Sequence, residues 1–157
     1  MQLSNVLSLG NQLMKQHGLT SLGWGFELDN AKRRFGVCRH RNRTISISKH
    51  LATLNDEAKV KDTILHEIAH ALVGPNHGHD HVWKRKCIEI GAKPERCYST
   101  DETNTPTLRY VAKCEACGKE HQKVKRPQPL SKYACRCQSH LPWSNRKILN
   151  YKDRYAA

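Results

Sequence analysis

The chain has 157 residues, of which 27 are Lys or Arg and 14 are Asp or Glu, so its formal net charge is +13. This length predicts one domain with a small appendage. No apolar run reaches the length of a membrane-spanning helix, and the N-terminus lacks a signal-peptide core. We therefore expect a monomer without a membrane partner, located in the cytoplasm and associated with the nucleoid, or nuclear in a eukaryote.

The positive charge is concentrated at the two ends of the sequence. Residues 1–50 carry 8 basic and 2 acidic residues, residues 51–100 carry 7 of each, and residues 101–157 carry 12 and 5. Basic flanks attract polyanions, and nucleic acid is the commonest polyanion in a cytoplasm. The charge could serve solubility alone, but its size favours a nucleic acid as a partner.

The first fifty residues predict a helix followed by strands. Apolar residues recur at helical spacing over residues 1–17, and Gly18 ends that helix. Alternating apolar residues over 23–48 predict a three-stranded antiparallel meander. Its solvent face is either simply solvated or forms a basic patch beside the functional site; the residues concerned are Arg33, Arg34, Arg39, Arg41 and Arg43.

Residues 55–73 predict an amphipathic helix that carries the motif His-Glu-x-x-His. Apolar residues recur every four positions, Thr53 with Asp56 can cap its start, and Gly74 followed by proline ends it. Residues four apart lie on one face of a helix, so His66 and His70 can point at one metal ion.

Glu67 follows His66 directly, as in zinc peptidases, where a carboxylate that is not a ligand acts as general base. A chance match on a surface helix is the plain alternative. Two histidines beside an apolar stripe favour the metal site, and a purely structural site would not need an acid at this position.

A catalytic zinc needs three protein ligands and one open position. Three histidines follow the motif within a few residues, namely His77, His79 and His81. The metzincin spacing does not hold, because Val73 and Asn76 stand where that pattern has Gly and His. A helix over residues 80–91 follows, with Trp83 on its inner side.

Together these residues resemble the SprT family of zinc metallopeptidases. In that family the third ligand begins a short His-Gly-x-x-Trp or His-Gly-x-x-Phe motif, which His79 and Trp83 match, with Asp80 in place of the usual Gly. The resemblance extends from about Leu19 to about Trp143. It implies His79 as the third ligand, with His77 as the alternative, and an endopeptidase that cleaves proteins bound or crosslinked to DNA.

A second, cysteine-based zinc site is predicted near the C-terminus. The polar stretch 99–108 is typical of a linker, and past it Cys114 and Cys117 form a Cys-x-x-Cys-Gly knuckle. Seventeen residues separate this pair from Cys135 and Cys137. Four thiolates favour a closed structural zinc site, and His140 is the alternative to Cys137. The odd total of seven cysteines argues against a disulfide framework. The other three are expected to be buried apolar residues: Cys38, Cys87 and Cys97.

Between and beside the cysteine pairs the sequence is basic. Lys123, Lys125, Arg126 and Arg136 are candidate phosphate contacts. The aromatic residues of this region either stack on unpaired bases or form the ribbon's small core; they are Tyr110, Tyr133 and Trp143.

The sequence therefore predicts an α+β protein with a zincin-like peptidase core over residues 1–98, a linker over 99–108, and a zinc ribbon with a basic tail over 109–157. Two zinc ions are expected, one catalytic and one structural. Two other functions stay open: a non-catalytic zinc-ribbon protein that binds nucleic acid, and a zinc hydrolase with a non-protein substrate.

Overall fold

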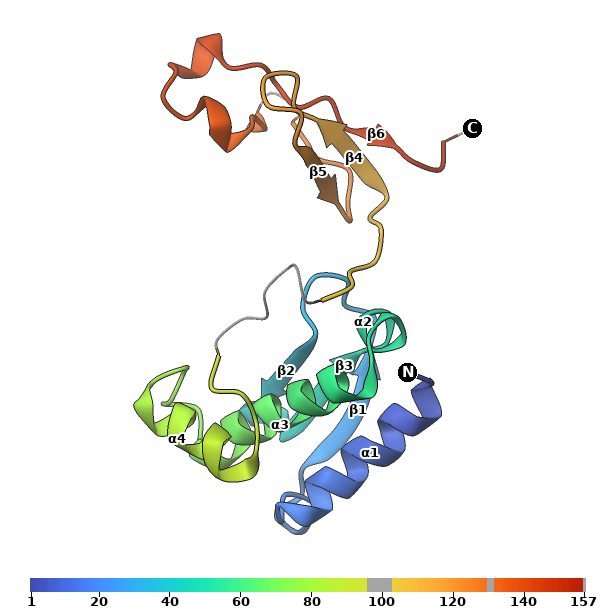
Figure 1. Cartoon of the computed structure of the whole chain (residues 1–157), viewed down its shortest axis with the longest axis vertical. Coiled ribbons are helices and arrows are strands. Elements are labelled where there is room, and N and C mark those ends of the chain that lie inside the picture. Colours follow the sequence, from blue (N-terminus) through green and yellow to red (C-terminus); the bar gives the residue numbers. More distant parts are fainter. Residues whose placement is uncertain (96–102, 130–131, 157) are drawn as a thin grey trace. The chain divides into compact units, whose positions relative to one another are not determined.

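The computed structural model of the chain describes residues 1–95, 103–129 and 132–156 (Figure 1). The chain divides into two compact units, Met1–Pro106 and Thr107–Ala157. The first unit carries helices on a small sheet, and the second is a small sheet with a cysteine cluster, so the predicted α+β class is confirmed. In the described ranges, no helix has both the length and the apolar character needed to cross a membrane.

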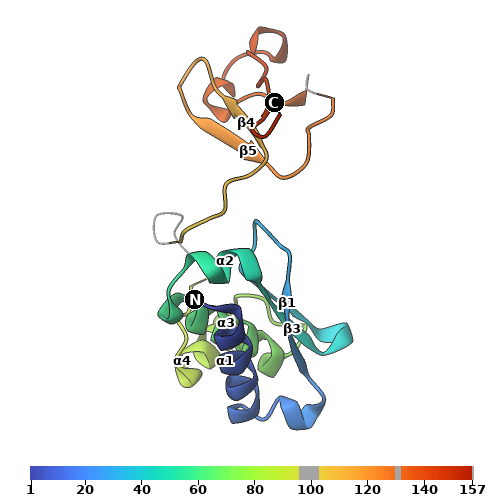
Figure 2. The same cartoon turned by 90° about the vertical axis from the view of Figure 1, so that its right-hand side faces the viewer.

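In the first unit a helix is followed by short strands and then by further helices (Figures 1 and 2). Its elements, in chain order, are α1 (Leu3–Gln16), β1 (Gly25–Asp29), β2 (Gly36–Arg39), β3 (Thr44–Ser48), α2 (Lys49–Leu54), α3 (Glu57–Val73) and α4 (His81–Ile90). As predicted, α1 ends where Gly18 adopts a φ of 73°, a left-handed conformation that glycine enters without steric cost.

The sheet of the first unit has the strand order β1-β3-β2. The predicted antiparallel meander is wrong in one respect, because β1 pairs with β3 in parallel and only the β2–β3 pair is antiparallel. Strand β3 takes the centre because every residue from Ile45 to Ser48 is buried, including two serines. Alternation along a sequence locates the strands, but burial on both faces, which decides the order, is a tertiary property.

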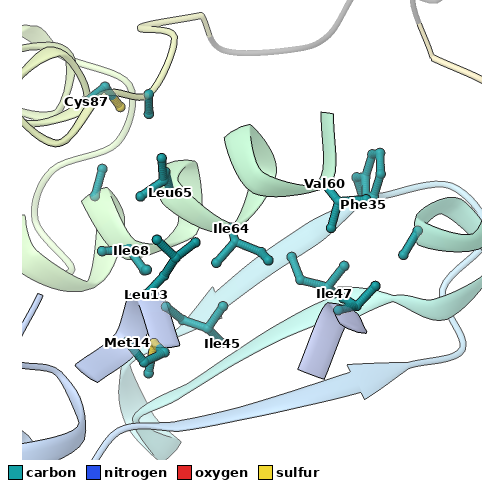
Figure 3. Close-up of a cluster of buried hydrophobic side chains, with 14 of the residues drawn as sticks. Leu13, Met14, Phe35, Ile45, Ile47, Val60, Ile64, Leu65, Ile68 and Cys87 are labelled. Atoms are coloured by element: carbon teal, nitrogen blue, oxygen red, sulfur yellow. The ribbon is translucent and has the colours of Figure 1, made fainter. Parts of the chain in front are cut away.

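Helix α3 supplies the main apolar contact with this sheet. Its residues Val60, Ile64 and Ile68 are fully buried, as are Ile45 and Ile47 of β3. Figure 3 shows these side chains in one layer between helix and sheet, joined by residues of α1. Burying an aliphatic side chain of this size contributes about 1.5–3 kcal/mol, so this layer fixes the position and rotation of α3.

The predicted start of the central helix needs a correction. Residues Lys49–Leu54 form the separate helix α2, in which the Thr53 hydroxyl donates to the Lys49 carbonyl instead of capping α3. Asp56 is the N-cap of α3, and its side chain accepts from the Lys59 N–H at 2.8 Å. Asp56 therefore caps the first turn, and α3 begins at Glu57.

Helix α4 ends at Gly91, whose φ is 80°. Trp83 and Cys87 on its inner side are fully buried, as predicted. Residues 96–102, which include Cys97 and the first part of the predicted linker, lie outside the described residues. Beyond them Asn104 exchanges hydrogen bonds with Asn55, so this part of the predicted linker lies against the end of α2.

The second unit contains a small antiparallel sheet with the order β5-β4-β6. Its strands are β4 (Tyr110–Lys113), β5 (Glu120–Lys123) and β6 (Lys152–Asp153). Its core is small and includes two cysteines; the buried members are Ala112, Cys114, Cys135, Leu149 and Tyr151, with Tyr110 and Tyr133 packed against them. A core this small needs a further link between its segments to be stable.

The contact between α1 and β1 generates the first prediction. A Cβ built on Gly10 of α1 would lie 2.1 Å from Cε1 of Phe26, so the ring fills the space a side chain would need. In an exposed helix Gly→Ala stabilises by about 0.5–1 kcal/mol. Here we expect Gly10→Ala to lower the free energy of unfolding by roughly 1–3 kcal/mol through overpacking, measured by denaturant unfolding.

The matched control is Ser8→Ala, an exposed position on the same helix. This variant should change stability by less than about 0.5 kcal/mol. A Gly10→Ala protein more stable than the native chain would show that Phe26 does not constrain α1.

Candidate functional site

Three histidines converge at the C-terminal end of α3. His66 and His70 lie one turn apart on that helix, and His79 comes from the loop before α4. The Nε2 atom of His79 lies 3.2 Å from Nε2 of His70 and 3.2 Å from Nε2 of His66. Nitrogen ligands of a tetrahedral zinc ion, at about 2.0–2.1 Å from the metal, are roughly 3.3–3.4 Å apart. The cluster therefore fits one metal ion of this size.

The protonation state of these histidines suits metal binding. Burial lowers the pKa of His66 to about 3, and the neighbouring His70 and His79 act in the same direction. Burial likewise lowers the pKa of His70 to about 4. At neutral pH both rings are therefore neutral and keep a lone pair for a metal, which is the form that binds.

Trp83 packs against all three rings from one side. Its ring centroid lies 4.7 Å from that of His66, 5.1 Å from that of His70 and 4.6 Å from that of His79. The indole is fully buried, so it contacts the histidines and not the solvent-filled side of the site. Trp83 thus lies on the inner side of its helix, as predicted, and supports the three imidazoles.

The loop between α3 and α4 is fixed by Asp80. One oxygen of this carboxylate accepts from the N–H groups of Val82 and Trp83 at 3.0 Å and caps α4. The other lies 2.8 Å from Nδ1 of His77, and that hydrogen bond lowers the pKa of Asp80 to about 2. The structure therefore pairs His77 with Asp80 and places His79 in the cluster.

The remaining histidine of this segment lies outside the cluster. His81 is exposed on the first turn of α4. A further tie links the loop to the helix, since the backbone of His77 hydrogen-bonds the ring of His70. The loop that delivers His79 is thus connected to both neighbouring helices.

Glu67 is the acid of the site, and only 6% of it is exposed. Burial raises the pKa of its carboxyl group to about 7, while a hydrogen bond from the Cys38 N–H and the charge of Arg34 act in the opposite direction. A cation in the neighbouring histidine cluster would favour the charged carboxylate further. Burial and a cation in the cluster would therefore act on the proton affinity of Glu67 in opposite directions.

A pocket of about 490 Å³ contains the cluster and Glu67. Strand β2 and the residues just before it form one wall, and the loop after α3 forms another. The lining residues beyond the cluster are Arg33, Arg34, Phe35, Gly36, Val37, Cys38, His40, Pro75 and His77. An open pocket with a few convergent polar groups is typical of a substrate-binding site.

Two residues of this wall were not predicted from sequence. Gly36 has no side chain of its own, and a Cβ added there would meet Glu67 at 2.6 Å. Cys38 was expected to be a buried apolar residue; its thiol is half-buried, lies 3.6 Å from Nε2 of His40, and has its pKa raised to about 12 by burial. Neither residue carries a recognisable motif, because its role depends on the strand that faces α3.

The predicted basic patch of arginines is only partly present. Arg33 and Arg34 line the pocket, and Arg34 is paired with Asp29. Arg39 instead contacts Glu27 and the Ser46 hydroxyl on the other face of the sheet, at 3.3 and 2.7 Å. The guanidinium of another member, Arg43, donates to the Leu22 carbonyl. Arg34 and Arg39 both pair with Asp29, so the charges of these two arginines are partly balanced by an acid that the sequence pattern did not connect with them.

Four cysteines form the second cluster, in the C-terminal unit. The Sγ atoms of Cys114 and Cys137 are 3.6 Å apart, those of Cys117 and Cys135 are 3.7 Å apart, and all four lie within 4.8 Å of one another. With zinc–sulfur distances of about 2.3 Å, tetrahedral thiolates are roughly 3.7–3.8 Å apart. The group contains Cys137 and not the alternative His140.

The turn that carries the first cysteine pair is a tight hairpin between β4 and β5. The Cys114 N–H donates to the Lys119 carbonyl at 2.9 Å, and Gly118 adopts a φ of 73°. Hydrogen bonds from the backbone N–H groups of Cys117 and Ala116 lower the pKa of Cys114 to about 7. These donors favour the thiolate form that metals bind.

Two further side chains contact the cysteine cluster, and one of them, Gln138, donates its amide N–H to Sγ of Cys114 at 3.9 Å. His121 of β5 places Nε2 at 3.2 Å from Sγ of Cys135. Sequence analysis did not identify it, because a histidine within a basic run has no spacing relation to the knuckles. A ring N–H beside a thiolate stabilises its charge, as neighbouring hydrogen-bond donors commonly do at metal sites.

The predicted phosphate contacts lie on the surface of the C-terminal unit. Lys125, Arg126 and Arg136 are exposed, while Lys123 places its ammonium 4.9 Å from the Tyr133 ring centroid. Tyr133 belongs to the small core, whereas Trp143 is 49% exposed. Of the three aromatic residues considered, Trp143 is therefore the most exposed, and the Arg146 guanidinium lies 5.2 Å from its ring centroid.

A search among curated proteins finds no match. The crystal structure of the metallopeptidase zymogen jannalysin of Methanocaldococcus jannaschii is similar to this chain, with 15% identity, a TM-score of 0.47, and coverage of 62% of this chain and 85% of that one. The sequence pattern of the SprT-like family matches residues 5–105, well over half of the chain and inclusive of both helices around the site, so the chain belongs to the SprT-like family.

Proposed function

We propose that this protein is a zinc-dependent endopeptidase of SprT type. The observation that carries the proposal is the convergence of three histidine nitrogens beside a buried carboxylate in one open pocket. Zinc would be held by His66, His70 and His79, the three-ligand arrangement that leaves one position for water or substrate. Membership of the SprT-like family supports the same assignment.

When bound, zinc supplies Lewis-acid chemistry: it polarises the scissile carbonyl and lowers the pKa of water to about 7. Glu67 takes the proton of the attacking water on its carboxylate and delivers it to the leaving amine. Burial raises the pKa of Glu67, whereas a zinc ion in the histidine cluster would lower it, so the carboxylate form that accepts the proton would be available at neutral pH.

The wall formed by β2 provides a place for the substrate backbone. This strand is at an edge of its sheet in the order β1-β3-β2 and borders the pocket. An extended peptide can add to such an edge by backbone hydrogen bonds, as in other zincin-type peptidases. The active site is thereby assigned to the N-terminal unit.

The four cysteines are assigned a second, structural zinc ion. Cys114, Cys117, Cys135 and Cys137 supply four thiolates and no open position, which is the closed arrangement of a zinc ribbon. The small core of this unit gains the link that it needs from the metal.

The substrates we propose are proteins bound or crosslinked to DNA, as the SprT relationship implies. The net charge of +13 and the exposed cations Lys125, Arg126 and Arg136 support binding of a polyanion. Such a protein would work as a monomer in the cytoplasm on nucleoid DNA, or in a nucleus.

Metal content tests the ligand assignment. Purified protein should contain close to two zinc ions, and His79→Ala should lose one of them because a ligand of the open site is removed. His77→Ala and His81→Ala are the controls and should keep both, as measured by atomic emission. Loss of zinc in His77→Ala with retention in His79→Ala would transfer the third-ligand role to His77.

Glu67→Gln tests the reaction. The amide keeps the size of the side chain but cannot accept the proton, so we expect kcat to fall at least about 10³-fold with both zinc ions retained. The assay is cleavage of a DNA-binding protein with and without DNA. Equal cleavage by Glu67→Gln would contradict the role of the base, and native protein that turns over only small non-protein substrates would favour the hydrolase alternative.

Salt dependence and truncation test the nucleic-acid part of the proposal. Binding through phosphates should weaken with salt, with a log–log slope of about −0.7 to −0.9 per neutralised phosphate, and depend little on sequence. Removal of residues 109–157 should reduce DNA binding and DNA-stimulated cleavage together, while the zinc of the histidine cluster stays bound. The DNA part of the proposal would be contradicted if DNA binding did not change with salt, or if added DNA did not change cleavage by the full-length protein. The peptidase proposal itself would still stand.

A further inference from the structure

The orientation of β2 determines what its backbone presents to the pocket. The Ser48 N–H donates to the Phe35 carbonyl at 2.7 Å, so the peptide groups of Phe35 point toward β3. In an antiparallel pair the direction alternates with each residue, which turns the N–H and C=O groups of Gly36 and Cys38 away from β3. These are the groups at the edge that borders the pocket.

The register determines which way the side chains of β2 point. Gly36 lies opposite Ile47 and Cys38 lies opposite Ile45. Directly opposite residues share a face of the sheet, and both isoleucines are fully buried in the layer against α3 (Figure 3). A side chain at position 36 would therefore point toward α3 and not into solvent.

The space that such a side chain would occupy is filled by Glu67. A Cβ on Gly36 would lie 2.6 Å from Oε1 of Glu67, 2.7 Å from its Cγ and 3.0 Å from its Cδ. The same carboxylate accepts a hydrogen bond from the Cys38 N–H, one of the two outward-facing donors. Glu67 thus contacts the edge of β2 at two neighbouring residues. Its side chain fills the space beside Cα of Gly36, and its carboxylate accepts the hydrogen bond of the Cys38 N–H.

We propose that Gly36 is a positioning residue for Glu67. Because Gly36 has no side chain, the Glu67 carboxylate can lie against the edge of β2, where the Cys38 N–H holds the carboxylate in the pocket of the three histidines. The contact itself stands on the geometry of β2 and α3. Its catalytic meaning rests on the proposed peptidase function, in which Glu67 is the general base.

A methyl group at position 36 should displace the carboxylate more than it damages the fold. The atoms in contact belong to the end of a flexible side chain that borders an open pocket, so Glu67 can move outward. It then loses the Cys38 N–H. Misplacement of a catalytic group by about 1 Å costs on the order of 10²-fold in rate, so we expect Gly36→Ala to lower kcat by that factor with little change in KM.

The matched control is Gly25→Ala in β1 of the same sheet, where a Cβ would meet nothing within 4 Å. We expect both variants to keep two zinc ions and similar melting temperatures, while only Gly36→Ala loses kcat. In a Glu67→Gln background, Gly36→Ala should leave the residual rate unchanged, since its effect passes through the carboxylate. A purely structural role would lower the melting temperature and would act equally in both backgrounds.

Amide hydrogen exchange of Cys38, followed by NMR on the zinc-loaded protein, measures the contact without any peptidase assay. The Cys38 N–H should exchange faster in Gly36→Ala and in Glu67→Ala than in the native and Gly25→Ala proteins. The proposal would be overturned if the Cys38 N–H exchanged at the native rate in Gly36→Ala. It would also be overturned if the native protein were an active peptidase and Gly36→Ala had the same kcat. An inactive native protein would refute the peptidase function, and the exchange result would still decide the contact.

A folding failure of Gly36→Ala has its own test. If the clash is with Glu67, the double variant Gly36→Ala with Glu67→Ala removes it and should fold. A double variant that still fails to fold would show that Gly36 is needed for another reason and would overturn the assignment.

Discussion

The packing of α3 against β3 is the contact on which the histidine site depends. One stripe of the helix, including Ile64 and Ile68, is fully buried in the layer shared with β3. This burial fixes the rotation of the helix about its axis. His66, Glu67 and His70 lie beside the stripe, so the same contact that stabilises the unit also directs these three side chains to one side. No further element is needed to orient the three side chains that α3 contributes to the site.

Sequence reasoning succeeded where the relevant interaction is local and periodic. Helical spacing places His66 and His70 on one face, and the cysteine spacings bring four thiols together at the β4–β5 turn. It failed where the partner is distant in the chain. The parallel pairing of β1 with β3 and the contact of Gly36 with Glu67 both depend on which strand lies beside α3, and no periodicity encodes that choice.

The two clusters differ in what surrounds them. The imidazoles converge from one side, with Trp83 behind them and a pocket of about 490 Å³ in front. The thiols approach one another from two segments, within a unit whose core includes Cys114 and Cys135. A ligand set that faces a cavity leaves room for chemistry, whereas one that forms part of a core is suited to stability.

Asp80 shows how a departure from the usual motif can preserve a site by a different interaction. Glycine at an N-cap is weaker than aspartate by only a few tenths of a kcal/mol, so capping of α4 alone does not explain the residue. The carboxylate also holds Nδ1 of His77, and the backbone of His77 in turn contacts the ring of His70. The segment from His70 to His79 is therefore closed by side-chain hydrogen bonds as well as by its backbone. In this chain the aspartate ties the third histidine to the helix that carries the other two.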